Sequence, residues 1–253
     1  MASQAAPRSS VAARPATHPP RGLKLFLSRY FYFSMTLLMA LLSLWAFSNT
    51  VAVRLLHANP PRPLLLWFHA AAFAAWIPLF VVQSTLVRAH RVRVHRTLGW
   101  IGAALAAFMV VSGFIVANVM LRFEITVLHQ QGVESFLAIL WCDLIIFGVC
   151  MALAIYFRKR PEYHRRLVFL ASCQLMQATF VRFHYLGYHN LFFPAVDLLI
   201  LAGILRDLIV DARINRVYLY AVPSMLVLQI FSTYLQRVNP AWWQSATHAI
   251  LGL

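Results

Sequence analysis

Residues 97–121 read TLGWIGAALAAFMVVSGFIVANVML, a stretch that contains no charged side chain. A helix rises about 1.5 Å per residue, so this stretch is long enough to cross the roughly 30 Å hydrocarbon core of a bilayer. Its apolar residues are not confined to one face, which predicts a helix surrounded by lipid or by other helices. Six further stretches have the same character: Tyr30–Val53, Pro63–Val87, Ser135–Phe157, Leu167–Val181, Asn190–Leu205 and Val217–Gln236. We expect the two shortest of these to extend through Arg182 and past Arg206.

The whole chain has the composition of a membrane protein. Of its 253 residues, 61% are hydrophobic and 11% are charged, whereas soluble domains carry about 25% charged residues. We therefore predict an all-α fold, a polytopic membrane helix bundle with about seven transmembrane helices, over residues 23–238. Residues 1–22 are predicted to form a disordered basic tail. Residues 239–253 are predicted to form an interfacial tail, with Trp242 and Trp243 in the headgroup layer.

Lysine and arginine concentrate in the segments that seven spans would place on one side. The net charge is +15, and the alternate segments counted from the N-terminus hold 17 of the 22 basic residues. The positive-inside rule then places the N-terminus in the cytoplasm and the C-terminus outside. Because these charges lie at span ends rather than on one continuous face, we expect membrane lipid as a partner and no nucleic acid.

Polar side chains inside the predicted spans gather towards the outer side. An ionisable group at the centre of a bilayer costs roughly 2.5–3.5 kcal/mol on insertion scales, so such groups usually face the bundle interior. Helical spacing places Gln83 on the face of His69 and groups Gln174, Gln177 and His184 on another face. We therefore expect a polar cavity that opens outwards and is lined by Arg182, Gln177, Gln174, Gln83 and Asn118.

Four of the buried ionisable residues are ligand types that suit zinc or another divalent metal. They are His69, Asp143, His184 and Asp197, and a metal-bound water among them could hydrolyse a substrate. In the alternative interpretation, Asp143 or Asp197 pairs with Arg182, and the histidine and glutamine side chains join helices by hydrogen bonds. The residues come from different helices, so their spacing does not decide between the two.

Two histidines open predicted spans on the cytoplasmic side, and an arginine follows each of them. His95 lies in VHRTLG (94–99) and His164 in YHRRLV (163–168). Two histidines on facing helices can supply both axial ligands of a b-type haem. In the alternative interpretation, these histidines lie at the interface and bind loop carbonyls or lipid phosphate.

The H-R-x-L-G pattern of His95, with a second His-Arg pair at His164, resembles uncharacterised bacterial multi-helix membrane families. Those families are loosely similar to cytochrome b561-type four-helix haem proteins. The resemblance implies haem b bound by His95 and His164, with His69 as one ligand of an outer pair whose partner histidine is missing from the fourth span. It also implies a bacterial inner membrane, and the acid-free, Arg- and Ser-rich start leaves an organellar membrane as the alternative.

Three classes of function remain open: a haem-binding redox protein, a metal-dependent membrane enzyme, and a small-molecule or proton-coupled transporter. The first implies a redox partner and the third a small molecule.

The chain contains no Walker loop, no G-x-G-x-x-G and no G-x-S-x-G, so nucleotide-driven transport and serine hydrolysis are not indicated. Its three cysteines form no C-x-x-C pair. The charged residues at the inner end of the sixth span, Arg206, Asp207, Asp211 and Arg213, are predicted to be solvated.

Overall fold

The computed structural model describes residues 22–253, without the side chains of Asn49 and Arg54, and that range folds into helices without a strand. The predicted all-α bundle is therefore confirmed, whereas the tail predicted for residues 1–22 lies almost wholly outside the described residues. Seven helices are long: α1 (Gly22–Val51), α2 (Leu64–Arg88), α3 (Val92–Thr126), α4 (Leu137–Tyr156), α5 (Pro161–Phe180), α7 (Phe192–Asp211) and α8 (Arg216–Val238). Four are short: η1 (Ala52–Leu56), η2 (Val133–Phe136), α6 (His184–Tyr188) and α9 (Ala241–Leu251).

Five helical segments within residues 22–253 are long and apolar enough to cross a membrane: Gly22–Ser48, Leu64–Arg88, Val92–Thr126, Val133–Tyr156 and Arg216–Val238. Large apolar side chains on their outer faces are open to the surroundings, for example Leu41 at 66% exposure, Ile101 at 61% and Val227 at 66%. An apolar exterior of this kind is compatible with an integral membrane protein, because lipid tails can cover it.

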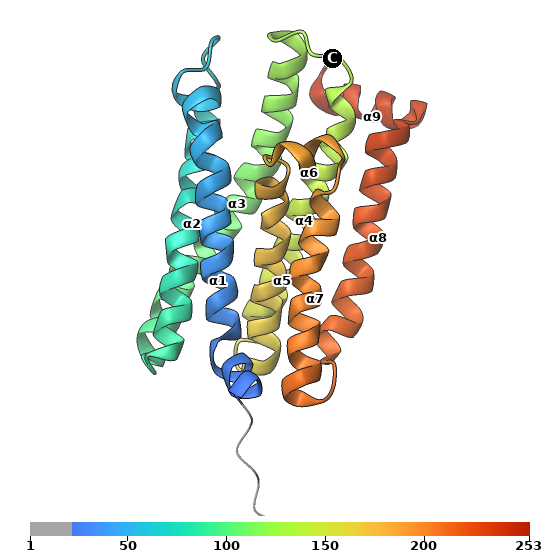
Figure 1. Cartoon of the computed structure of the whole chain (residues 1–253). Coiled ribbons are helices and arrows are strands. Elements are labelled where there is room, and N and C mark those ends of the chain that lie inside the picture. Colours follow the sequence, from blue (N-terminus) through green and yellow to red (C-terminus); the bar gives the residue numbers. More distant parts are fainter. Residues whose placement is uncertain (1–21) are drawn as a thin grey trace, which may run out of the picture.

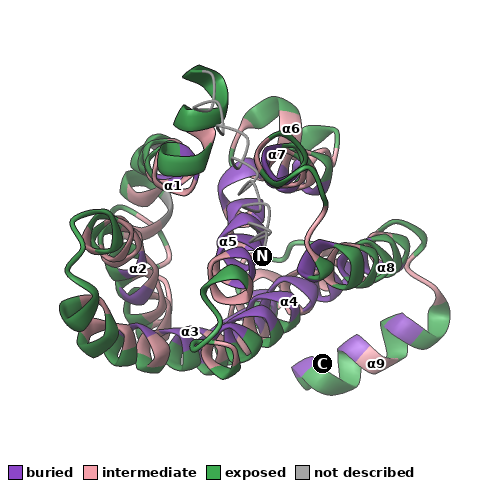
Figure 2. Cartoon of the chain, turned by 90° about the horizontal axis from the view of Figure 1, so that it is seen from below, coloured by how far each residue is buried: buried purple, intermediate pink, exposed green. Residues whose placement is uncertain are grey.

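The two remaining long helices, α5 and α7, differ from these segments because they carry buried polar and charged residues. Figure 1 shows both running alongside the other long helices, and in the end-on view of Figure 2 α5 lies in the middle, with α1, α4 and α7 around it. Among the buried residues of α5 are Arg166, Gln174 and Gln177. In α7, Arg206 and Asp207 are buried.

The long helices alternate in direction, so their connections gather at two ends of the bundle (Figure 1). The basic end comprises the first turn of α1 and the connections at residues 89–91, 157–160 and 212–215. The far end comprises the loop at residues 57–63, η2, α6 and α9.

Residues in the first turn determine where two helices begin at the basic end. Pro161 and Glu162 occupy the first turn of α5, where proline needs no hydrogen-bond partner and an acid complements the helix dipole. The Asn215 side chain caps α8 by accepting from the Val217 N–H at 3.0 Å.

One expectation about the far end is wrong. The fifth span does not extend through Arg182, because α5 ends at Phe180 and the backbone becomes extended at Phe183 before α6 begins. The C-terminal tail, predicted as an interfacial segment, forms the helix α9, which packs against η2 and α3. In α9, Trp243 is buried while Trp242 is 56% exposed. The sixth predicted span does extend past Arg206, since α7 ends at Asp211.

Candidate functional site

The two histidines of the His-Arg pairs lie side by side at the basic end. His95 is in the first turns of α3 and His164 in the first turn of α5, and their ring centres are 6.2 Å apart, with the ring planes at 79°. Nδ1 of His164 lies 2.9 Å from the carbonyl oxygen of Ala154, near the end of α4. A carbonyl can only accept, so this nitrogen carries the proton and Nε2 of His164 has a free lone pair.

The other ring is held by Gln83, on the last turns of α2. With its amide nitrogen towards His95, Gln83 donates to Nδ1 at 2.5 Å and to the His95 carbonyl at 3.2 Å, and its oxygen accepts from the Gly99 N–H at 2.9 Å. In this orientation Nδ1 accepts, so the proton of the neutral ring is on Nε2, and Nε2 has a lone pair for a ligand only after the proton moves to Nδ1 and the amide turns over, which sets the Gln83 oxygen against the His95 carbonyl and its nitrogen against the Gly99 N–H. In both orientations Nδ1 faces Gln83, and no hydrogen bond from a described residue reaches Nε2 of either ring.

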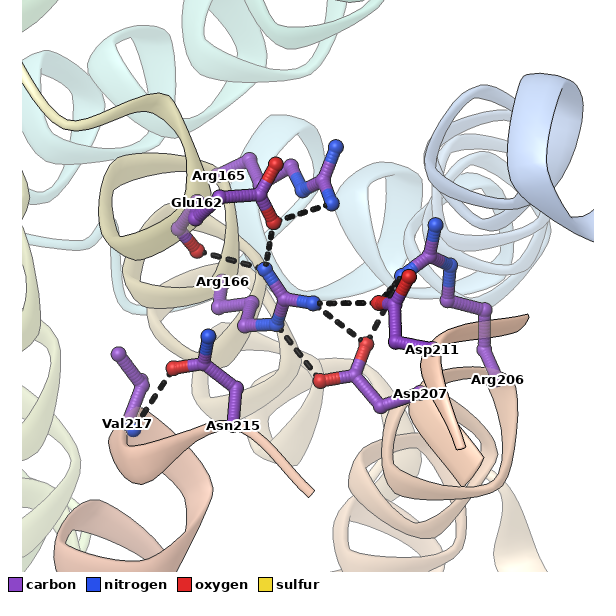
Figure 3. A network of polar contacts seen from close by, with 8 residues as sticks. All are labelled: Glu162, Arg165, Arg166, Arg206, Asp207, Asp211, Asn215 and Val217. Carbon is purple, nitrogen blue, oxygen red and sulfur yellow. Dashed lines mark hydrogen bonds and ion pairs between the residues drawn. The ribbon is translucent and has the colours of Figure 1, made fainter. Parts of the chain in front are cut away.

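A cluster of buried charges adjoins this pair at the basic end (Figure 3). The Arg166 guanidinium, 1% exposed, donates two hydrogen bonds of 2.7 Å to the carboxylate of Asp207, which is fully buried. Arg166 also binds Asp211 at 3.1 Å and Glu162 at 2.6 Å. Arg206 reaches Asp207 at 2.9 Å and Asp211 at 2.7 Å. These contacts join α5 to α7 by charge-assisted bonds that leave neither buried guanidinium without a counter-ion.

The prediction of a solvated end for the sixth span is therefore wrong for Arg206 and Asp207, whereas Asp211 and Arg213 are exposed. Arg206 and Asp207 are buried because α7 packs against α5, which supplies Arg166 as their neighbour. The sequence contained one signal for this cluster. The chain has only seven acidic residues, and three of them, Glu162, Asp207 and Asp211, lie among the arginines at positions 158–166 and 206–216.

A second group of polar residues forms a chain in the half of the bundle towards the far end. Gln174 of α5 donates to the Asp143 carboxyl of α4 at 2.6 Å, and Gln229 of α8 donates to the Gln174 oxygen at 3.3 Å. Asp197 of α7 also interacts with Gln229. The expectation that these residues line a cavity does not match this arrangement, because their side chains bind one another across the helix interfaces.

The four residues considered as metal ligands do not converge. Within residues 22–253, no three His, Cys, Asp or Glu side chains are placed to hold a metal ion together. His69 on α2 contacts the Ser112 hydroxyl at 3.3 Å, and His184 is exposed on α6. Asp143 and Asp197 belong to the amide chain. His69 has no second histidine beside it that would complete an outer haem site among the described residues.

The other residues expected to line the cavity do not gather at one place. Gln83 lies at the basic end, far from the amide chain. Arg182 is exposed, donates to the carbonyl of Ala178 and lies over the Phe47 ring, with 4.0 Å between its guanidinium carbon and the ring centre. Asn118 and Gln177 each have a buried side-chain atom without a hydrogen-bond partner. The far end does contain a cavity of about 270 Å³, but residues of α3, η2 and α8 such as Glu124, Ser135 and Gln236 line it.

Comparison with known proteins gives no relative: no family model, no curated protein and no solved structure matches this chain. The function must therefore be inferred from the arrangement of its own residues.

Proposed function

We propose that the chain is a haem b protein of a bacterial inner membrane, with His95 and His164 as the axial ligands and a redox role. The observation that supports this is the pairing of two imidazoles from α3 and α5 whose Nδ1 atoms are both held and whose Nε2 atoms are not. Haem supplies one-electron redox chemistry when it is bound between two such nitrogens.

The separation of the rings fits axial ligation. Two metal–nitrogen bonds of about 2.0 Å each, together with the distance from each nitrogen to its ring centre, span roughly 6 Å. The ring centres of His95 and His164 are 6.2 Å apart. The two ligands come from different helices, so they can approach an iron from opposite sides.

The partners of the Nδ1 atoms fit as well. A metal-binding histidine commonly donates its second N–H to a carbonyl or a carboxylate, which fixes the ring and makes the other nitrogen a better ligand. Ala154 provides such a carbonyl to His164. For His95, Gln83 would supply an acceptor only with its amide oxygen turned towards the ring, which gives up its bonds to the His95 carbonyl and from the Gly99 N–H.

The charge of the basic end suits the carboxylates that a haem carries at its edge. Arg93 and Arg96 flank His95 in the sequence and are exposed, and Arg165 follows His164. Arginine binds carboxylate groups by charge-assisted hydrogen bonds, which would hold the haem edge near the cytoplasmic headgroups. This arrangement requires that all seven long helices cross the bilayer with the basic end in the cytoplasm, as the positive-inside rule favours.

The absorption spectrum of the protein purified in detergent from haem-replete cells tests the proposal. We expect a Soret band that shifts on reduction, and we expect His95→Ala and His164→Ala each to abolish it. His90→Asn is the matched control, because His90 is exposed at the same end and asparagine tolerates its positive φ of 56°. A colourless protein that also fails to take up added haemin would overturn the proposal.

A further inference from the structure

Asp143 lies inside the bundle without a cation beside it. Its carboxyl group is 9% exposed, and it lies on α4 six residues after Leu137, or about 9 Å from the far end of the helix. Its hydrogen-bond partner is the Gln174 amide at 2.6 Å, and no ion pair joins it to any described Lys, Arg or His. An ionised carboxylate in such a place costs many kcal/mol unless it is paired, so a positive charge must come from elsewhere.

The amide chain beside Asp143 has unused hydrogen-bonding capacity. Gln229 donates to Gln174, but the Gln229 side-chain oxygen is buried without a donor. The Gln177 side-chain nitrogen, one turn above Gln174, is buried without an acceptor. Both residues are at least 97% buried, with exposures of 3% and 1%. Buried polar groups without a hydrogen-bond partner are rare in the interior of a folded protein, and here they point to a small ligand, water or proton that completes the network.

We propose that Asp143 is a proton-binding site in the outer half of the bundle, and that its carboxyl group holds a proton in the resting protein. With the proton on one oxygen, the group is neutral and its other oxygen accepts the hydrogen bond from Gln174. A proton needs no coordination shell, which agrees with the lack of a converging set of ligands among residues 22–253. The site does not depend on the haem proposed at the basic end.

Two acids belong to the amide chain, and Asp143 is the more deeply buried of them. On α4 itself Cys142 precedes it, with Ser232 of α8 beside that thiol. The packed helices contribute Gln174 from α5, then Gln229 from α8, and Asp197 of α7 lies across Gln229. Polar groups continue from Gln174 towards the far end through Gln177 and the Thr179–Ser43 contact of 3.0 Å. This order favours proton entry from the far end.

Infrared spectroscopy of the purified protein in an ester-free detergent tests the site. We expect the carbonyl band of a protonated carboxylic acid at neutral pH, its loss at alkaline pH, and its absence in Asp143→Asn. Asp207→Asn is the control, because Asp207 is buried but paired with Arg166 and should contribute no such band. Should Asp143→Asn not fold, Gln174→Leu removes the hydrogen bond to the carbonyl oxygen and should move the band to higher frequency.

Three results would overturn this proposal. One is a wild-type spectrum at neutral pH without any protonated-carboxyl band. Another is loss of the band when sodium ions are added at constant pH, because that would assign the site to a metal cation. An unchanged band in Gln174→Leu would place the protonated acid at another residue and would contradict it equally.

Discussion

At the residue scale, the orientation of the Gln83 amide decides which nitrogen of His95 is available. We expect Gln83→Leu to weaken haem binding about 10–100-fold, because His95 then lacks the acceptor that fixes its ring and raises its basicity. Gln83→Glu keeps an acceptor at the same position and should retain haem. Titration of the haem-free protein with haemin, followed at the Soret band, measures both. Equal affinities for the leucine and glutamate variants would show that Gln83 does not support the ligand.

The pairing of His95 with His164 could be expected from the sequence, and the structure contains it. Both residues stand at the start of a helix at the same end of an alternating bundle, so position along the chain was sufficient. The hydrogen-bond partners of their Nδ1 atoms could not be predicted from sequence position. Gln83 was assigned to the face of His69 by helical spacing alone, but spacing does not tell which end of α2 meets another helix.

At the element scale, the Arg166–Asp207 pair joins α5 to α7. Asp207→Asn leaves the buried Arg166 guanidinium short of a counter-ion, so we expect a loss of about 3–5 kcal/mol in stability. Asp211→Asn should cost less, about 1 kcal/mol, because this carboxylate is 35% exposed and water can replace its contacts. Thermal unfolding in detergent, followed by circular dichroism, ranks the two variants.

The double variant Arg166→Met/Asp207→Leu separates charge pairing from packing. Removing both partners leaves no unpaired charge on α5, and Arg206 keeps Asp211 as its counter-ion. Apolar replacements of buried pairs are often neutral or stabilising, so we expect most of the loss in Asp207→Asn to be recovered. A double variant as unstable as Asp207→Asn would mean that the charges are not the source of the loss.

At Gly203, α7 lies close to side chains of α5 and α8. A Cβ at this position would lie 2.5 Å from the Tyr218 hydroxyl oxygen and 2.6 Å from the Phe169 ring. Gly203→Ala should therefore destabilise the protein by about 1–3 kcal/mol through overpacking. Gly102→Ala is the control, because its Cβ would meet only Leu79, at 3.5 Å. Comparable melting temperatures for the two variants would contradict the close packing of α7 between α5 and α8.

The helix boundaries show where composition misleads at this scale. The span predicted from Leu167 begins at Pro161 in the structure, since charged residues at its start concealed the first turns of α5. The positive-inside rule counts Arg166 among the cytoplasmic charges, like every arginine of its segment. Arg166 does lie at the basic end, but it is buried because Asp207 neutralises it there. Hydropathy cannot distinguish a solvated charge from a paired one.

At the scale of the whole molecule, polar residues are divided between the two ends of one bundle. The histidine pair and the charge cluster lie at the basic end, and the amide chain with Asp143 lies in the half towards the far end. The central helix α5 takes part in all three, with His164 and Arg166 near its start and Gln174 near its end. Its low hydropathy therefore reflects its position inside the bundle, because neighbouring helices rather than lipid surround its polar side chains.

The orientation of the bundle gives the last prediction. The cysteines at positions 142, 150 and 173 are buried, so a single introduced thiol reports its own side of the membrane. Arg91→Cys lies in an exposed connection at the basic end, and Tyr188→Cys lies on α6, where the tyrosine is 76% exposed. With an impermeant thiol reagent on intact cells, we expect position 188 to react and position 91 to react only after permeabilisation. The reverse pattern would place the histidine pair on the outer side of the membrane, and labelling of both positions in intact cells would mean that the long helices do not all cross it.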